Sequence, residues 1–123
     1  MKPSNSIRAL TPLACAASMW ALGLAGTAQA APTDTFCTPN QVVVFDDAPR
    51  LHVRCDESVG GIVYFAIDTN DAAQAARVLS VIQTALVAGR TLIVNYDPAD
   101  LTGAAIGCQT NDCRLIRRIG FGK

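Results

Sequence analysis

Four cysteines constrain the fold of this chain more than any other feature. They are Cys37, Cys55, Cys108 and Cys113, whereas the fifth cysteine, Cys15, lies in an N-terminal segment with the features of an export signal. An even number of cysteines in a short exported domain indicates a disulfide framework. The sequence does not choose among the three pairings that four cysteines allow. The local pairs Cys37–Cys55 and Cys108–Cys113 close the shortest loops, and we expect these two.

A metal clip and a redox pair are the alternatives for Cys108 and Cys113. A zinc site prefers C-x2-C knuckles or added histidines, and His52 is the only histidine in the chain. A redox pair is more often C-x-x-C in a thioredoxin-like βαβ context, which is missing here. The C-x4-C spacing therefore favours a structural disulfide, and we expect no metal and no other cofactor.

The N-terminal segment predicts export. Basic residues precede an apolar run over residues 13–25, and the small-residue pattern of a cleavage site follows at residues 28–30. This is the pattern of a secretory signal peptide, and the apolar run is too short to cross a bilayer. We therefore expect a signal peptide at residues 1–30 and a single domain at residues 31–123. This domain would be periplasmic or secreted, with no membrane insertion after cleavage.

The charge of the predicted domain argues against polyanionic partners. Residues 31–123 carry eight basic and ten acidic side chains, a net charge of −2. Nucleic acids and anionic membranes bind mainly to basic surfaces, so neither is expected as a partner. The C-terminal arginines do not change this, because period two places Arg117 on one face of the last strand and Arg114 and Arg118 on the other. That split suits a charged edge strand better than a nucleic-acid stripe.

The hydrophobic pattern predicts the element order β-β-β-α-β-β. A proline-containing turn joins the first two strands in a hairpin, and the third strand is a continuous apolar run. This is the order of the OB-fold, a small five-stranded barrel with a helix between the third and fourth strands. An open α+β sheet with one packed helix is the alternative. The expected strands are residues 41–45, 50–55, 62–67, 91–97 and 114–121, and the expected helix is residues 71–88.

The two faces of the expected helix differ in an informative way. Thr69, Asn70 or Asp71 would cap its start and Gly89 its end. One apolar stripe would face the core, comprising Ala75, Val78, Leu79, Ile82, Ala85 and Leu86. The opposite face includes Arg77, Ser80 and Thr84, and Arg77 is the only charge inside the helix. Either this is an alanine-rich helix with a neutral surface, or this outer face packs against a second copy in a homo-oligomer.

The sequence contains no catalytic constellation. His52 is predicted in mid-strand and is interpreted as a structural or surface histidine. Asp46 and Asp47 occupy a turn that favours aspartate in any case. With all four thiols in disulfides no cysteine nucleophile remains, so we expect no enzymatic activity and no catalytic residues.

The region from the helix onward resembles a known family. The helix ends in "ALVAG", the next strand closes in Tyr96-Asp97-Pro98, and "LTGAAIGC" then leads to the second cysteine of the C-x4-C pair. These motifs, over about residues 79–113, resemble the binding (B) subunits of subtilase-cytotoxin and pertussis-like toxins. That resemblance implies an exported OB-fold that forms a pentameric ring and binds sialylated glycans. It also implies a ligand site at Tyr96 and Asp97, because the family's tyrosine lies by the glycan pocket.

The chain departs from that family in its first half. It has no counterpart of the serine that contacts sialic acid in the toxin subunits, and Cys55 lies one strand earlier than the corresponding cysteine. The sequence therefore predicts an exported, non-enzymatic binding module for glycans, either as a toxin-like B subunit or as a stand-alone periplasmic protein. The alternative is a periplasmic inhibitor, structural protein or interaction module with a protein partner. A small hydrolase centred on His52 is the third hypothesis.

Overall fold

The structure is a computed structural model that describes residues 30–122, so the predicted signal peptide lies outside the described residues except for Ala30. The described part has seven strands, one α-helix and one 3₁₀ helix. In chain order they are β1 (Thr33–Cys37), β2 (Pro39–Val44), β3 (Arg50–Val59), β4 (Ile62–Asp68), α1 (Ala72–Ala88), β5 (Leu92–Tyr96), η1 (Thr102–Ile106), β6 (Cys113–Leu115) and β7 (Arg118–Phe121). None of these helices is long and apolar enough to cross a membrane.

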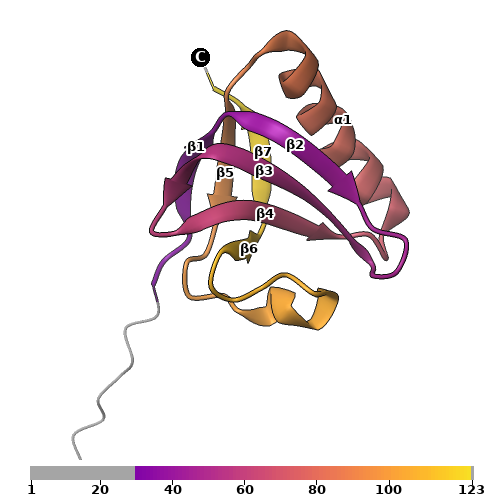
Figure 1. Cartoon of the computed structure of the whole chain (residues 1–123), viewed down its shortest axis with the longest axis vertical. Helices are drawn as coiled ribbons and strands as arrows, with labels where there is room; N and C mark the ends of the chain where they lie inside the picture. The colour runs from indigo at the N-terminus through magenta and orange to yellow at the C-terminus, as the bar shows by residue number, and fades with distance from the viewer. Residues whose placement is uncertain (1–29, 123) are drawn as a thin grey trace, which may run out of the picture.

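The strands form two sheets, one of three strands in the order β1-β5-β7 and one of four in the order β2-β3-β4-β6 (Figure 1). The mainly β fold with one helix is confirmed. Over residues 30–122 the sheets do not close into a barrel, which agrees with the alternative of an open α+β architecture. The pairing nevertheless follows the OB order. β2, β3 and β4 form an antiparallel meander, β4 pairs parallel with β6, and β5 pairs antiparallel with both β1 and β7.

Two chain segments pass from one sheet to the other. β1 and β2 are separated only by Thr38, and β6 and β7 only by Ile116 and Arg117. At the second crossing the amide of Ile116 donates to Ala66 in one sheet, and the amide of Arg117 donates to Asn95 in the other. The predicted single strand over residues 114–121 is therefore wrong, because its two halves pair with different sheets.

The other differences from the predicted elements also come from long-range pairing. β1 is absent from the predicted elements because three of its five residues are polar, yet its backbone pairs with β5. β3 runs past the predicted end at residue 55, since antiparallel pairing resumes at Val59 and Ile62. Residues 102–106, between the last two predicted strands, form the 3₁₀ helix η1.

Helix α1 matches its predicted ends and faces. The carboxylate of Asp71 accepts a hydrogen bond from the amide of Gln74 (2.9 Å), and Gly89 ends the helix with φ of +61°. Val78 and Ile82 are buried in the core that both sheets and the helix share, together with Phe65 of β4. The opposite face of α1, predicted to point outward, is exposed to solvent.

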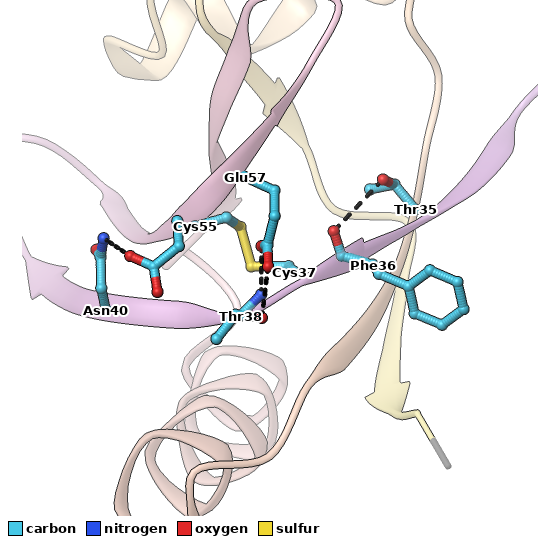
Figure 2. Close-up of a disulfide and its surroundings, with 8 residues drawn as sticks. Thr35, Phe36, Cys37, Thr38, Asn40, Cys55 and Glu57 are labelled. Carbon is cyan, nitrogen blue, oxygen red and sulfur yellow. Dashed lines mark hydrogen bonds between the residues drawn. A yellow bond between two sulfur atoms is a disulfide. The ribbon is translucent and has the colours of Figure 1, made fainter.

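Both expected disulfides are present, Cys37–Cys55 and Cys108–Cys113. The first ties the crossing between β1 and β2 to β3, and Figure 2 shows the Phe36 ring pointing away from it. Beside it the Glu57 carboxylate accepts hydrogen bonds from the amide (2.9 Å) and hydroxyl (2.7 Å) of Thr38. The carbonyl of Thr38 also accepts a hydrogen bond from the amide of Asp56 (2.9 Å), so one covalent bond and three hydrogen bonds hold the crossing between the sheets.

Candidate functional site

A second, smaller core covers the outer face of β4. Ala66 of β4, Cys108 and Cys113 are buried there, and Tyr64 and Leu115 pack against them. The chain reaches this face after β5 and runs through η1, which lies at the opposite end of the sheets from α1 in Figure 1. Ala66 is fully covered, whereas His52, its partner on β3, is only half-buried. The cover over the sheet therefore stops between these two residues.

A pocket of about 260 Å³ opens where the second core ends, beside His52. Strands β3 and β4 form its floor and the loop closed by the Cys108–Cys113 disulfide forms its wall. Its side chains include a cation, an imidazole, a phenol ring, an amide and a carboxylate. The lining residues are Arg50, His52, Tyr64, Gly107, Gln109, Asp112 and Cys113.

Two of the lining rings, His52 and Tyr64, lie side by side on the floor of the pocket, and the Phe45 ring meets His52 edge-on. The imidazole of His52 lies between Phe45, at 5.0 Å between ring centroids, and Tyr64, at 4.9 Å. Burial lowers the pKa of His52 below its ordinary value, and the positive charge of Arg50 lowers it further, against an opposing effect of Asp112. The lowered pKa favours the neutral ring of His52 at pH 7, and a neutral imidazole can both donate and accept a hydrogen bond.

The guanidinium of Arg50 lies over the Phe45 ring at one side of the pocket. Its central carbon lies 4.0 Å from the centroid of the Phe45 ring. The backbone of Gly107 lies close to it, since a Cβ built on Gly107 would be 2.9 Å from Nη1 of Arg50. The Nε of Arg50 is buried and has no hydrogen-bond partner, and no carboxylate within residues 30–122 forms an ion pair with this side chain.

The polar residues of the wall are positioned by backbone contacts. The carbonyl of Asp112 accepts hydrogen bonds from the amides of Val63 and Tyr64, both at 3.0 Å. The Cys108–Cys113 disulfide closes the loop that contains Gln109 and Asp112. A carboxylate and an amide thus face the pocket from a short, covalently closed loop.

The sequence prediction placed the ligand site elsewhere. Tyr96 is 2% exposed and packs on Phe65 in the main core, with ring centroids 5.1 Å apart. Asp97 is 4% exposed, and its carboxylate accepts hydrogen bonds from Arg117 (3.1 Å) and from the amide of Ala99 (2.9 Å). Neither residue lines the pocket. A ligand site at Tyr96 and Asp97 therefore stays a prediction, and it would lie elsewhere on the protein.

The sequence contains a pattern that places two of the pocket residues together. Arg50 and His52 share one face of a strand by period two, and the Asp46-Asp47 turn next to them is where a loop was expected. From the sequence His52 is interpreted as a structural or surface histidine, because it lies in mid-strand beside Val53 and Arg54, with no catalytic partner. The partner residues, Gln109 and Asp112, come from the far end of the sequence, and no local pattern connects them to β3.

The remaining predicted residues lie on the surface. Arg77, Ser80 and Thr84 are exposed on the outer face of α1, where the hydroxyl of Thr84 donates to the carbonyl of Ser80 (2.7 Å). Among the described residues, no group of three His, Cys, Asp or Glu is placed to hold a metal ion. No family model, no curated protein and no solved structure matches this chain.

Proposed function

We propose that this protein is an exported, non-enzymatic binding module that holds a sugar ring in the pocket between β3, β4 and the Cys108–Cys113 loop. The observation that carries the proposal is the convergence of aromatic and hydrogen-bonding side chains from three separate segments around one small pocket. Its volume of about 260 Å³ lies just below the usual range for small-ligand sites, about 300–1,000 Å³, and suits a single ring.

The side chains match the two faces of a sugar. Tyr64 and His52 offer flat ring surfaces for the C–H face of a pyranose, and Tyr64 adds a hydroxyl. Gln109 and Asp112 offer an amide and a carboxylate for the hydroxyl edge. The site also lies on the face formed by the second and third strands of the OB order, beside the loop that precedes the last strand, where OB-folds bind oligosaccharides.

Catalysis is not part of the proposal. His52 is the only imidazole, its ring neighbours are Phe45 and Tyr64, and the four cysteines are in disulfides. The pocket therefore presents no activated nucleophile beside a base. The resemblance to toxin B subunits favours a glycan as the ligand and a ring-shaped homo-oligomer, although the site that it implies is at Tyr96 and Asp97 rather than in this pocket. A stand-alone periplasmic role fits the pocket as well.

A glycan array followed by calorimetry on the oxidised protein tests this function. Asp112→Asn and Gln109→Ala should each weaken a glycan hit by about 0.5–1.5 kcal/mol, the net value of one hydrogen bond. Gln83→Ala, which shortens an exposed glutamine on α1, is the matched control and should leave binding unchanged. The proposal fails if no glycan binds, or if a glycan binds equally well to all three variants.

An exposed apolar row favours a second candidate, a protein-interaction module. Phe36, 65% exposed, pairs with Ile93 on the outer face of the three-stranded sheet, and Gly120 continues the row on β7. A groove of about 280 Å³ runs along the same face. Phe36→Ser should then abolish association with a partner or a second copy, as measured by analytical ultracentrifugation. A protein that stays monomeric and binds no co-purified partner would leave only the sugar-binding candidate.

A further inference from the structure

Among the residues that line the pocket, Arg50 has a buried hydrogen-bond donor for which the described chain supplies no acceptor. Its guanidinium carries a fixed positive charge and five N–H donors. Within residues 30–122 it forms no ion pair and donates no hydrogen bond, and its Nε is buried without a partner. A buried donor without an acceptor costs about 1–3 kcal/mol, so an unpaired guanidinium that persists in a pocket calls for an explanation.

The two residues in contact with the guanidinium of Arg50, Phe45 and Gly107, hold it in place without neutralising it. The Phe45 ring covers one side at 4.0 Å, and Gly107 gives the loop backbone room to approach Nη1. A ring face and a glycine fix the position of a guanidinium but supply no negative charge. The guanidinium is thus pre-positioned at the pocket with its hydrogen-bonding edge unfilled, which is the arrangement that recognises carboxylates and similar anions.

We propose that the ligand of this pocket carries a singly charged anionic group that binds the guanidinium of Arg50, and that His52 takes up a proton from solvent when this group binds. The inference rests on the proposed function in that it takes this pocket as the ligand site. A single charge is favoured because Asp112 lines the same pocket and would repel a second one.

The coupling follows from the position of His52. Three charged or titratable groups lie beside its ring: Arg50 from β3, Tyr64 from β4 and Asp112 from the disulfide loop. Arg54 is two residues further along β3, exposed and outside the pocket lining. On the β2 side its partner is the uncharged Val43. In the free protein the charge of Arg50 opposes protonation of His52. A bound anion offsets that charge and adds its own attraction for an imidazolium, so the pKa of His52 rises on binding.

The sign of the pH dependence is therefore fixed. Because the bound state holds its proton up to a higher pH than the free state, affinity rises as the pH falls through the bound-state pKa of His52. It levels off below the free-state pKa. Each unit by which binding raises the pKa gives about a tenfold gain in affinity.

The chain offers a direct measurement, because His52 is its only histidine and every imidazole resonance in the spectrum belongs to it. The probes are D-glucuronate, D-glucose as the neutral sugar of matched shape, and acetate as the anion alone. NMR titrations of the oxidised protein between about pH 5 and 8 follow His52 and the backbone amides. We expect D-glucuronate to shift the pocket amides, to raise the pKa of His52 and to bind more tightly at lower pH, and D-glucose to leave that pKa unchanged.

Two variants separate Arg50 from its neighbour. Arg50→Gln should weaken D-glucuronate by about 10- to 100-fold and abolish its effect on His52, since charge-assisted hydrogen bonds are lost. Arg54→Gln removes an exposed charge from the same face of β3. It should change neither the affinity for D-glucuronate nor the effect of D-glucuronate on the pKa of His52. If Arg50→Gln does not fold, Arg50→Lys keeps the charge and should retain the proton coupling with a lower affinity. The wild-type titrations decide the matter without either variant.

The outcomes distinguish this inference from the proposed function. Equal binding of both sugars with an unchanged pKa of His52 overturns the inference and supports the sugar site. A rise in that pKa with acetate that requires Arg50, while neither sugar binds, supports anion binding and overturns the sugar site. No response to any of the three probes overturns both.

Discussion

Gly107 lies against the guanidinium of Arg50, and a residue with a side chain cannot take that place without moving the arginine. A Cβ on Gly107 would be 2.9 Å from Nη1 of Arg50, and its φ of +83° is a conformation that residues other than glycine avoid. The contact joins the residue just before the Cys108–Cys113 loop to β3 at the edge of the pocket.

Gly107→Ala should therefore have two effects. Backbone strain should lower the free energy of unfolding by about 1–2 kcal/mol, and the displaced guanidinium should let the pKa of His52 rise toward its ordinary value. Gly60→Ala is the matched control, because Gly60 has φ of +60° and no atom within 4 Å of its Cβ position. Urea unfolding and NMR titration of His52 measure both effects. An unchanged pKa in Gly107→Ala would mean that the contact does not hold Arg50 in place.

The two disulfides should differ in what they support. Replacing both Cys108 and Cys113 by alanine should cost about 2 kcal/mol of stability and weaken ligand binding, because the loop that presents Gln109 and Asp112 is released. Replacing both Cys37 and Cys55 should cost more, about 3 kcal/mol, because that bond closes a longer loop.

Denaturant unfolding and a binding titration with the same ligand compare the two double variants. The Cys37/Cys55 variant, where it remains folded, should keep the affinity of the wild type. Equal losses of affinity in both variants would show that the Cys108–Cys113 bond has no specific role at the pocket.

As the pH falls, the protein should lose stability in two separate pH ranges, first that of His52 and then that of the carboxylates. The folded protein binds a proton at His52 less readily than the unfolded chain does, so His52 contributes stability that is present above its ordinary pKa of 6.5. That stability is lost as the pH falls through the folded-state value. Hydrogen bonds from Thr38 lower the pKa of Glu57, and hydrogen bonds from Thr102 lower that of Asp100. These carboxylates lose their contributions only below their ordinary values of 4.5 and 3.8.

Urea midpoints measured from neutral to acid pH test this division. In His52→Gln the loss of stability that begins near pH 6.5 should disappear, whereas the loss at lower pH, caused by protonation of the carboxylates, should remain. Stability that is flat from neutral pH down to the pH range of the carboxylates in the wild type would contradict the lowered pKa of His52.

The outer face of α1 gives a prediction about assembly. If Ser80 and Thr84 pack against a second copy, Ser80→Glu and Thr84→Lys should each disperse the oligomer and leave the monomer folded. A surface charge alone usually changes stability by less than about 0.5 kcal/mol. Light scattering measures the assembly, with Thr110→Glu, an exposed position on the disulfide loop, as the control. A monomeric wild type at high concentration would leave the alternative, a neutral alanine-rich surface.

Tyr96 and Tyr64 distinguish the site inferred from the resemblance from the site inferred from the pocket. Tyr96 is in the core, so we expect Tyr96→Phe to leave ligand affinity unchanged. Tyr64 lines the pocket, so Tyr64→Ala should weaken binding of a sugar through loss of its ring face. Calorimetry with the same glycan measures both, and melting temperatures report any effect on the fold. Weaker binding in Tyr96→Phe at an unchanged melting temperature would instead support the site at Tyr96 and Asp97.

The sequence by itself determined the local features of this protein. Helix α1 follows from the spacing of Val78 and Ile82, its end follows from Gly89, and the hairpin of β2 and β3 follows from the turn between them. The disulfides pair cysteines that are near each other in the chain. Each of these features depends on interactions between residues close in sequence, so its physical cause is visible in a short window.

Only the tertiary structure decided the features that depend on distant partners. β1 is a strand because β5 supplies its hydrogen bonds, and the last predicted strand divides because Ile116 and Arg117 pair with different sheets. The pocket exists because the loop after η1 folds over β4 but leaves His52 of β3 partly open. Burial and hydrogen bonding act between residues that meet in space, so the site that Asp112 shares with Arg50 appears only when the chain is folded.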